Sequence, residues 1–191
     1  MSVGAGSEQS DQHDGSAGRA MLKDVGDKEY NAVCRFYFRE ARLFSQSNYR
    51  EWIDAMVDRE IHYWLPVFED RYKNDRKAPP AFPPSIYDDD FEDLDSRICQ
   101  LETNLARRLD PAPRIRHLIT NIEAFETDVA GDIHALSNFL VCRNRREREQ
   151  SILVGGREDL LRMTNEGLRL VRRRINIPQR VVLDSDLYFM M

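Results

Sequence analysis

Hydrophobic side chains recur at helical spacing in the first third of the chain and predict two amphipathic helices. The first series spans residues 27–44 in steps of three and four, so its members share one helix face. Asp27 stands where an N-cap side chain would accept the first free amide groups. A second series over residues 49–57 repeats the pattern, and Asn48 and Glu51 have the spacing of a capping pair. The apolar members of the first series are Tyr30, Val33, Cys34, Tyr37, Phe38, Ala41 and Phe44.

At residues 58–59 the hydrophobic period changes to two, which predicts a β-strand that continues to residue 67. Residues 69–85 are polar and then proline-rich, so we expect an extended, stiff connection there. The side chains expected to face the core from the strand are Ile61, Tyr63, Leu65 and Val67, and those on its other face are Glu60, His62, Trp64 and Pro66.

A third helix is expected to open at Asp88-Asp89-Asp90 and to close at Arg107-Arg108. Acidic residues at the start and basic residues at the end both complement the helix dipole. The three aspartates lack the glycine and the distal glutamate of a calcium loop, so the helix terminus is the simpler explanation for them. The apolar positions of this helix are Phe91, Leu94, Ile98, Leu101 and Leu105.

Alternating patterns fill the rest of the chain and predict four long strands joined by short turns, which is typical of an antiparallel sheet. Together, the elements predict an α+β fold: a cone formed by a strongly curved, mainly antiparallel sheet with three helices packed in its concavity. The strands are expected at residues 114–127, 131–145, 151–163 and 168–177.

The domain organisation follows from composition along the chain. Residues 1–26 are rich in Gly, Ser, Asp and Gln and offer almost nothing to bury, so we expect a flexible tail, or an arm that orders against a partner subunit. Residues 27–191 are expected to form a single domain.

Overall composition narrows the class of protein. The net charge of −5 and the pI near 5.5 argue against a nucleic-acid-binding surface. No apolar run approaches the ~20 residues of a membrane span, and the N-terminus lacks the pattern of a signal peptide. Cys34, Cys99 and Cys142 are scattered within apolar patterns, which predicts buried thiols in a reducing compartment. We therefore expect a soluble cytoplasmic protein.

Candidate catalytic motifs are weak. The four histidines, His13, His62, His117 and His134, show no metal-ligand spacing, although His117 and His134 on neighbouring strands could supply a pair. Gly155-Gly156 precedes no helix that could hold a phosphate, so a bulge or a close backbone approach explains it better.

A set of polar residues on the predicted strands has two interpretations. It is either an acid/base constellation in a pocket or a lattice of Arg–carboxylate pairs on a sheet surface or subunit contact, and the spacing favours the lattice. The set consists of Asp58, His62, Tyr63, Arg114, Arg116, His117, Arg157, Asp159, Arg172 and Arg174.

From about Glu29 to the C-terminus, blocks of residues occur in an order that resembles the small (beta) subunits of Rieske-type aromatic-ring-hydroxylating dioxygenases. The blocks are Glu40-Ala41-Arg42-Leu43, Tyr49 with Trp52, Tyr63-Trp64-Leu65-Pro66 with Arg71, Tyr87-Asp88-Asp89-Asp90, Leu94, Arg97-Ile98, Leu101-Glu102-Thr103, Pro113-Arg114-Ile115-Arg116-His117-Leu118-Ile119-Thr120-Asn121, Gly155-Gly156-Arg157-Glu158-Asp159-Leu160-Leu161-Arg162 and Arg172-Arg173-Arg174-Ile175.

The resemblance implies a fold like nuclear transport factor 2 and a hexamer of three large (alpha) and three small subunits that cis-dihydroxylates an aromatic substrate in aromatic catabolism. It implies that the large subunit holds the Rieske 2Fe-2S cluster and the mononuclear non-haem iron, with ferredoxin and reductase as indirect partners. The small subunit is then mainly structural, without catalytic, cofactor or metal residues of its own. The chain indeed lacks the Cys-x-His and Cys-x-x-His pairs of a Rieske cluster.

Subunit contacts are therefore the expected role of the aromatic and arginine residues. The alternative is a stand-alone isomerase or dehydratase on the same fold, with Asp58, Tyr63 and His117 as its acid/base set. A pure interaction module is a third possibility. The predicted interface residues are Tyr63, Trp64, Arg71, Phe82, Arg114, Arg116, His117, Arg157, Asp159, Arg172 and Arg174.

Overall fold

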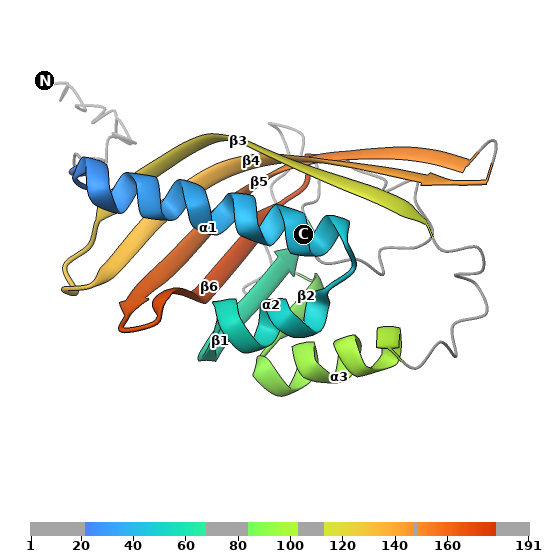
Figure 1. Ribbon diagram of the computed structural model, residues 1–191, viewed down its shortest axis with the longest axis horizontal. Coiled ribbons are helices and arrows are strands. Elements are labelled where there is room, and N and C mark those ends of the chain that lie inside the picture. Colours follow the sequence, from blue (N-terminus) through green and yellow to red (C-terminus); the bar gives the residue numbers. More distant parts are fainter. Residues whose placement is uncertain (1–21, 68–83, 103–112, 147–148, 179–191) are drawn as a thin grey trace, which may run out of the picture.

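The computed structural model describes residues 22–67, 84–102, 113–146 and 149–178. Helices dominate the first half of this part of the chain and strands dominate the second (Figure 1). In chain order the elements are α1 (Asp27–Ser45), α2 (Tyr49–Met56), β1 (Val57–Pro66), β2 (Ser85–Asp89), α3 (Phe91–Glu102), β3 (Arg114–Glu126), β4 (Asp132–Arg145), β5 (Glu149–Thr164) and β6 (Gly167–Asn176).

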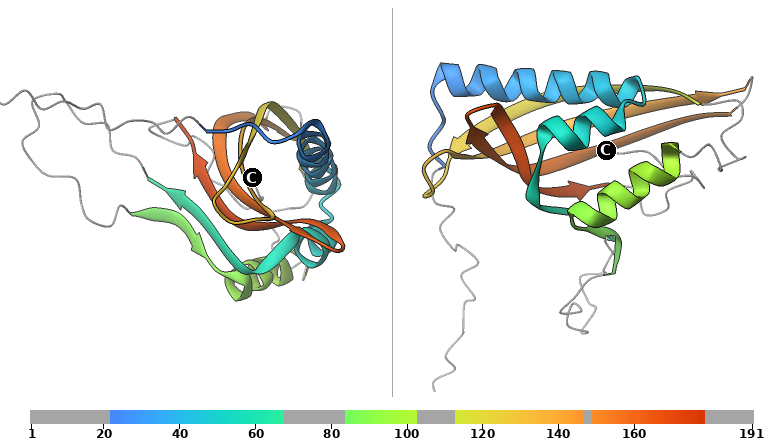
Figure 2. Two further views of the ribbon diagram at one scale, coloured as in Figure 1. Left: turned by 90° about the vertical axis from the view of Figure 1, so that its left-hand side faces the viewer. Right: turned by 60° about the horizontal axis from the view of Figure 1, so that its bottom comes forward.

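The six described strands form one sheet in the order β2-β1-β6-β5-β4-β3. Neighbouring strands are antiparallel, except that β1 and β6 run parallel. The sheet curves strongly, and the helices pack against its inner, concave face (Figure 2). The predicted α+β cone with three helices in its concavity is therefore confirmed, and the parallel β1–β6 pair explains why the sheet is only mainly antiparallel.

The core lies between the helices and the inner face of the sheet. Ile61, Tyr63 and Leu65 of β1 are buried as the alternation predicts, whereas Val67 beyond the strand is exposed. A Cβ on Gly155 of β5 would lie 2.5 Å from the ring of Phe139 and 2.6 Å from the carbonyl oxygen of Asn176. The close backbone approach expected at this glycine is confirmed, because no larger residue fits there.

Strand β2 was not predicted, and it corrects the start of the third helix. Asp88 and Asp89 belong to β2, and only Asp90 caps α3, where its Oδ1 accepts the amide of Asp93 at 3.0 Å. Asp89 is buried on the inner side of β2. Its charge is compensated there, because the guanidinium of Arg97 donates to both of its oxygens at 2.6 and 3.0 Å. Because Asp89 is a polar residue at a buried position, the sequence of β2 does not show the alternation of hydrophobic and polar residues that is typical of a strand. The expected end of the helix at Arg107-Arg108 lies outside the described residues.

The predicted caps of the first two helices differ in detail. Asp27 is the first residue of α1 rather than its cap, because Gly26 occupies the N-cap position. Asn48 is the N-cap of α2, but its side chain donates to the carboxylate of Glu51 at 2.7 Å and makes no bond to the backbone. Side-chain pairing has thus replaced the expected capping box.

The segment before α1 lies along the edge strand β3. The amide of Val25 donates to the carbonyl of Ala124 at 3.2 Å, and the amide of Glu126 donates to the carbonyl of Lys23 at 2.8 Å. Asp24 forms an isolated antiparallel bridge with Phe125. The last residues of the predicted tail therefore pair with the sheet, while the tail and the single domain themselves stay predictions.

The three cysteines are free. Cys34 and Cys142 are half-buried, but Cys99 is exposed on α3 beside Arg50, so the prediction of a buried thiol is wrong there. Helix α3 buries Ile98, and the next residue along points to solvent because successive helix positions differ by 100°. Among the described residues, no helix is both long and apolar enough to span a bilayer.

Candidate functional site

Four charged side chains meet on the inner face of the sheet, and we call them the buried ion network: Glu40 of α1, Arg157 and Asp159 of β5, and Arg173 of β6. Arg173 donates to Glu40 at 2.9 and 3.1 Å and to Asp159 at 2.9 and 2.7 Å. Arg157 donates to the second oxygen of Glu40 at 2.8 Å. These four side chains are fully buried, and their formal charges sum to zero.

Two neutral donors complete the network. The Tyr37 hydroxyl donates to Asp159 at 2.9 Å, and the Trp52 indole donates to Glu40 at 2.9 Å. The remaining guanidinium nitrogens of Arg157, Nε and Nη2, make no hydrogen bond to a described residue, and this cation lies 5.1 Å from the centroid of the Phe139 ring. The carboxylate of Glu40 thus accepts from three donor groups and that of Asp159 from two, as buried charges require.

The local sequence explains how the network comes together. Tyr37 and Glu40 are three residues apart and share the core face of α1, whereas Arg157 and Asp159 are two apart and share the inner face of β5. In the register of β5 and β6, Asp159 lies directly opposite Arg173. Helical and strand periodicities therefore converge on one point of the core.

Three groups of the network, Glu40, Arg173 and Tyr37, have pKa values that are displaced away from neutral pH. Burial alone would raise the pKa of Glu40, but the charges of Arg173 and Arg157 outweigh burial and leave this pKa below its usual value. Burial lowers the pKa of Arg173, yet the carboxylates of Asp159 and Glu40 raise it well above the usual value. Burial, with the charge of Asp159, raises the pKa of Tyr37 well above its usual value. General acid–base catalysis needs a pKa near the working pH, so these groups are fixed in one state.

The outer face of the sheet carries a second set, which we call the outer-face row: Asp88 of β2, Trp64 of β1, Arg174 of β6 and Glu158 of β5. Trp64 lies between Asp88 and Arg174 in the strand register. The Arg174 guanidinium lies 5.3 Å from the centroid of the Trp64 ring, and its Nη1 is 3.8 Å from a carboxylate oxygen of Glu158. His62 stacks on Trp64 and contacts Asp88 at 2.8 Å. This row is a solvated lattice of aromatic and charged groups.

The sequence-predicted interface residues fall on both faces of the sheet. Tyr63, His117, Arg157 and Asp159 are buried inside the chain's own fold. Trp64 is half-buried on the outer face. The exposed members are Arg114, Arg116, Arg172 and Arg174. Arg71 and Phe82 lie outside the described residues.

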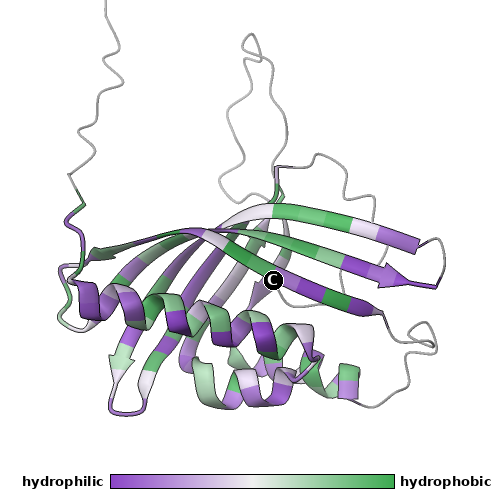
Figure 3. Cartoon of the chain, turned by 45° about the horizontal axis from the view of Figure 1, so that its top comes forward, coloured by the Kyte–Doolittle hydropathy of each residue, from purple (hydrophilic) through white to green (hydrophobic). Residues whose placement is uncertain are grey.

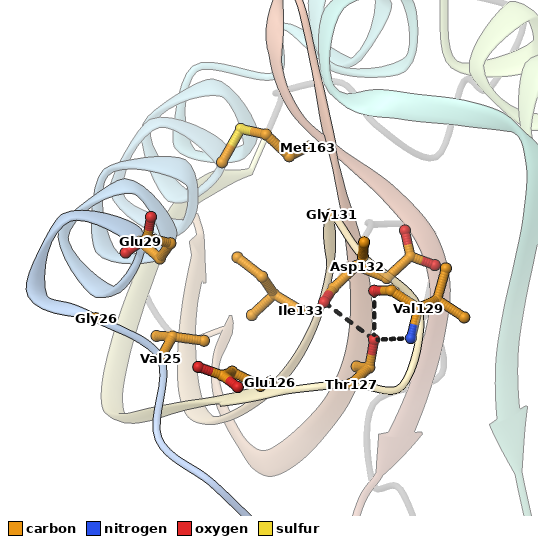
Figure 4. A pocket seen from close by; sticks show the side chains of 11 residues that line it. Val25, Gly26, Glu29, Glu126, Thr127, Val129, Gly131, Asp132, Ile133 and Met163 are labelled. Atoms are coloured by element: carbon orange, nitrogen blue, oxygen red, sulfur yellow. Dashed lines mark hydrogen bonds between the residues drawn. The ribbon is translucent and has the colours of Figure 1, made fainter.

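An open pocket of about 450 Å³ lies at the end of the sheet where α1 begins and β3 turns into β4 (Figure 4). Its apolar lining includes Val25, Ile133 and Met163, and its acidic lining includes Glu29 and Glu126. None of the residues proposed for a stand-alone enzyme, Asp58, Tyr63 and His117, lines this pocket.

The described residues contain no group of three or more His, Cys, Asp or Glu side chains that could hold a metal ion. His117 is buried next to Phe44 on the inner side, whereas His134 contacts Glu158 at 3.3 Å on the outer side. The two histidines therefore do not converge, because they point to opposite faces of the sheet.

Residues 39–184 match the family model described as the ring hydroxylating beta subunit. This match covers well over half of the chain. The chain belongs to the ring-hydroxylating beta subunit family.

Members of this family with similar sequences include two dioxygenase subunits. The beta subunit of biphenyl 2,3-dioxygenase from Rhodococcus jostii (strain RHA1) is 31% identical over 159 residues, which cover 81% of this chain and 84% of the relative. The beta subunit of benzene 1,2-dioxygenase from Pseudomonas putida is 31% identical over 163 residues, which cover 83% of this chain and 87% of the relative.

Solved structures show the same fold. A naphthalene 1,2-dioxygenase structure with indole bound matches with a TM-score of 0.82 and 22% identity, over 89% of this chain and 90% of that chain. The beta subunit of benzoate 1,2-dioxygenase from Burkholderia mallei matches with a TM-score of 0.68 and 17% identity, over 88% of this chain and all of that chain. The cone-shaped fold of the nuclear transport factor 2 type is confirmed for this beta subunit.

Sequence reasoning on this beta subunit missed half of the buried ion network. Glu40 and Arg173 did not enter the candidate set, although Arg157 and Asp159 did. The available signal was position: Glu40 lies on the core face of α1 between Tyr37 and Leu43, and Arg173 alternates with the buried Val171 and Ile175. A charge at an apolar position indicates a buried pair when an opposite charge occupies the matching position on a neighbouring element.

Proposed function

We propose that this beta subunit is non-catalytic and serves to assemble a ring-hydroxylating dioxygenase. The observation that carries the proposal is the buried ion network. Its carboxylates and guanidinium groups neutralise one another inside the fold, between α1 and the inner face of β5 and β6. No general acid or base is available from these groups near neutral pH, because the pKa values of Glu40, Arg173 and Tyr37 are displaced from it.

The partner is a large oxygenase subunit in the cytoplasm, with three large and three small subunits per hexamer. That subunit holds the Rieske 2Fe-2S cluster and the mononuclear iron and receives electrons through ferredoxin and reductase. Two relatives are beta subunits of enzymes named for biphenyl and benzene, which supports an aromatic ring as the substrate that the assembly cis-dihydroxylates.

The members of the predicted interface that lie on the outer face supply a contact surface. Trp64, Arg172 and Arg174 lie on the outer face near the parallel β1–β6 pair. Aromatic residues and arginine are enriched at subunit interfaces, and a stacked Trp–Arg pair presents a large, rigid surface. The buried members, Tyr63 and Asp159 among them, hold this part of the sheet from the inner side.

The test is co-expression of this chain with a tagged large subunit from a neighbouring reading frame, followed by measurement of native mass and iron content. The expected result is a hexamer that contains iron, whereas the small chain expressed and purified alone contains none. Iron held by the isolated small chain, or a small oligomer that ignores the large chain, would overturn the proposal.

A further inference from the structure

One edge of the buried Arg157 guanidinium, which carries Nε and Nη2 and which we call its side edge, makes no hydrogen bond to the described residues. The side chain is 0% exposed, and its printed bond runs from the opposite nitrogen, Nη1, to Glu40 at 2.8 Å. Buried N–H groups almost always have a partner, and a guanidinium can only donate. The side edge therefore requires a hydrogen-bond acceptor.

Two other arginines of this protein show how such an edge is normally occupied. Arg173 donates from Nε and Nη2 to the two oxygens of Asp159 at 2.9 and 2.7 Å. Arg97 donates from the same two atoms to the oxygens of Asp89 at 2.6 and 3.0 Å. This two-pronged geometry is the one in which arginine grips a carboxylate. Arg157 differs from both, because no described carboxylate accepts from its side edge.

A second buried polar group without a partner lies beside Arg157. Ser137 of β4 is directly opposite Arg157 in the β4–β5 register, and it is 3% exposed. Its Oγ makes no hydrogen bond to the described residues. Directly opposed residues have Cβ atoms about 4.5–5.5 Å apart, so the hydroxyl and the guanidinium are neighbours. Hydrophilic positions recur among hydrophobic ones along the strands that pass behind α1 (Figure 3).

We propose that Ser137 and the side edge of Arg157 form a binding site for one internal water molecule. The water oxygen accepts from Nε and Nη2 of Arg157, and the water donates to Oγ of Ser137. Three hydrogen bonds are the typical number for a buried water. A water also needs room, and the side chains of Ser137 and of Ala135, which precedes it on the same face of β4, are small.

An anion fits the charges of this site less well than water. The four charged side chains of the buried ion network already sum to zero, so an anion at the side edge adds an uncompensated buried charge. Burying a charge without a counter-charge is costly, whereas a neutral water supplies the same acceptor without that cost. The site therefore takes a neutral oxygen ligand.

The water extends the buried ion network to a further strand. Arg157 is held by Glu40 of α1 at Nη1, and the water holds its side edge from β4. The polar contacts then join α1, β4, β5 and β6. Because these contacts lie inside the subunit, the inference does not depend on the proposed role in assembly.

The sign of the stability change in Ser137→Ala tests the site in the full chain. If Oγ is bonded to a buried water, its removal breaks a hydrogen bond, and we expect the unfolding equilibrium constant to rise about two- to tenfold in denaturant unfolding. If Oγ has no partner, its removal relieves an unsatisfied buried group and makes the chain more stable. An unchanged or lower unfolding constant in Ser137→Ala would overturn the proposal. Ser85→Ala is the matched control, because Ser85 is exposed on β2.

A high-resolution crystal structure of the full chain, with bromide added, tests the identity of the ligand. We expect the density of one water within about 2.7–3.2 Å of both Arg157 and Ser137, without anomalous bromide signal. An anomalous peak there would assign the site to an anion and overturn the proposal. Density of a protein group at the side edge, or no density between the two side chains, would overturn it as well.

Discussion

Arg173 and Arg174 are adjacent in the sequence but lie on opposite faces of β6. Arg173 is 0% exposed and bonded to two carboxylates, whereas the side chain of Arg174 is 45% exposed and lies 3.8 Å from Glu158. A buried charge that loses its partners is costly, and an exposed ion pair contributes little. The comparison indicates that the inner face stabilises the fold, while the outer face is available for contacts with other chains.

The largest expected effect is that of Arg173→Ala. The change leaves Glu40 and Asp159 buried with one guanidinium between them, and loss of a buried partner typically costs about 3–5 kcal/mol. Denaturant unfolding followed by circular dichroism measures the loss. If the unfolding free energy of Arg173→Ala lies within about 1 kcal/mol of that of the unchanged protein, the network does not stabilise the fold.

Removing one neutral donor should cost less. Tyr37→Phe deletes the hydroxyl that bonds to Asp159 at 2.9 Å but keeps the ring in the core. A hydrogen bond to a charged group contributes about 1.5–3 kcal/mol, so we expect a loss in that range by the same unfolding assay. Tyr49→Phe is a control, because Tyr49 is also buried and takes no part in the network.

The network also predicts a pH dependence. The pKa of Glu40 is lowered in the folded state, so its contribution is present above the usual glutamate pKa of about 4.3 and is lost as pH falls through the lower folded value. Each pKa unit of difference between the folded and the unfolded state corresponds to about 1.4 kcal/mol of unfolding free energy. Unfolding free energies of the unchanged protein and of Glu40→Gln should therefore converge in acid. Parallel pH profiles for the two proteins would contradict this assignment.

The smallest effect on stability is expected at the outer-face row. Arg174→Ala removes an exposed ion pair with Glu158, whose charged atoms are 3.8 Å apart. The change should alter the unfolding free energy by less than about 1 kcal/mol. Trp64→Ala should likewise leave a folded subunit but weaken assembly, which native mass measurement of the co-expressed complex detects. An unchanged hexamer mass in Trp64→Ala would remove the outer-face row from the interface.

Much of this fold was predictable because its helices and long strands follow regular hydrophobic periods. β2 escaped prediction because its buried Asp89 breaks the alternation, and the pairing that justifies burial comes from Arg97 in a different element. The exposure of Phe38 escaped prediction because a helix pattern does not show how wide a face the core will cover.

The candidate site was predicted less completely. Arg157 and Asp159 stand out as charges on a strand, but nothing local to Glu40 or Arg173 indicates which partner each will meet. Those contacts depend on the three-dimensional register of α1, β5 and β6. Periodicity assigns a residue to a face, whereas a charge network requires the order of strands in the sheet.

The parallel pairing of β1 with β6 has a consequence for how the chain folds. It joins an early strand to the last one described, and the bond between Glu40 and Arg173 spans 133 residues of sequence. Closing such long loops costs conformational entropy before the contacts form, which slows folding. On the ribosome, α1 and β1 emerge well before β6, so the ionic centre is completed only after β6 has been synthesised. A partner subunit that binds before β6 is synthesised therefore binds a chain without the buried ion network, and one that binds later binds a chain in which the network is complete.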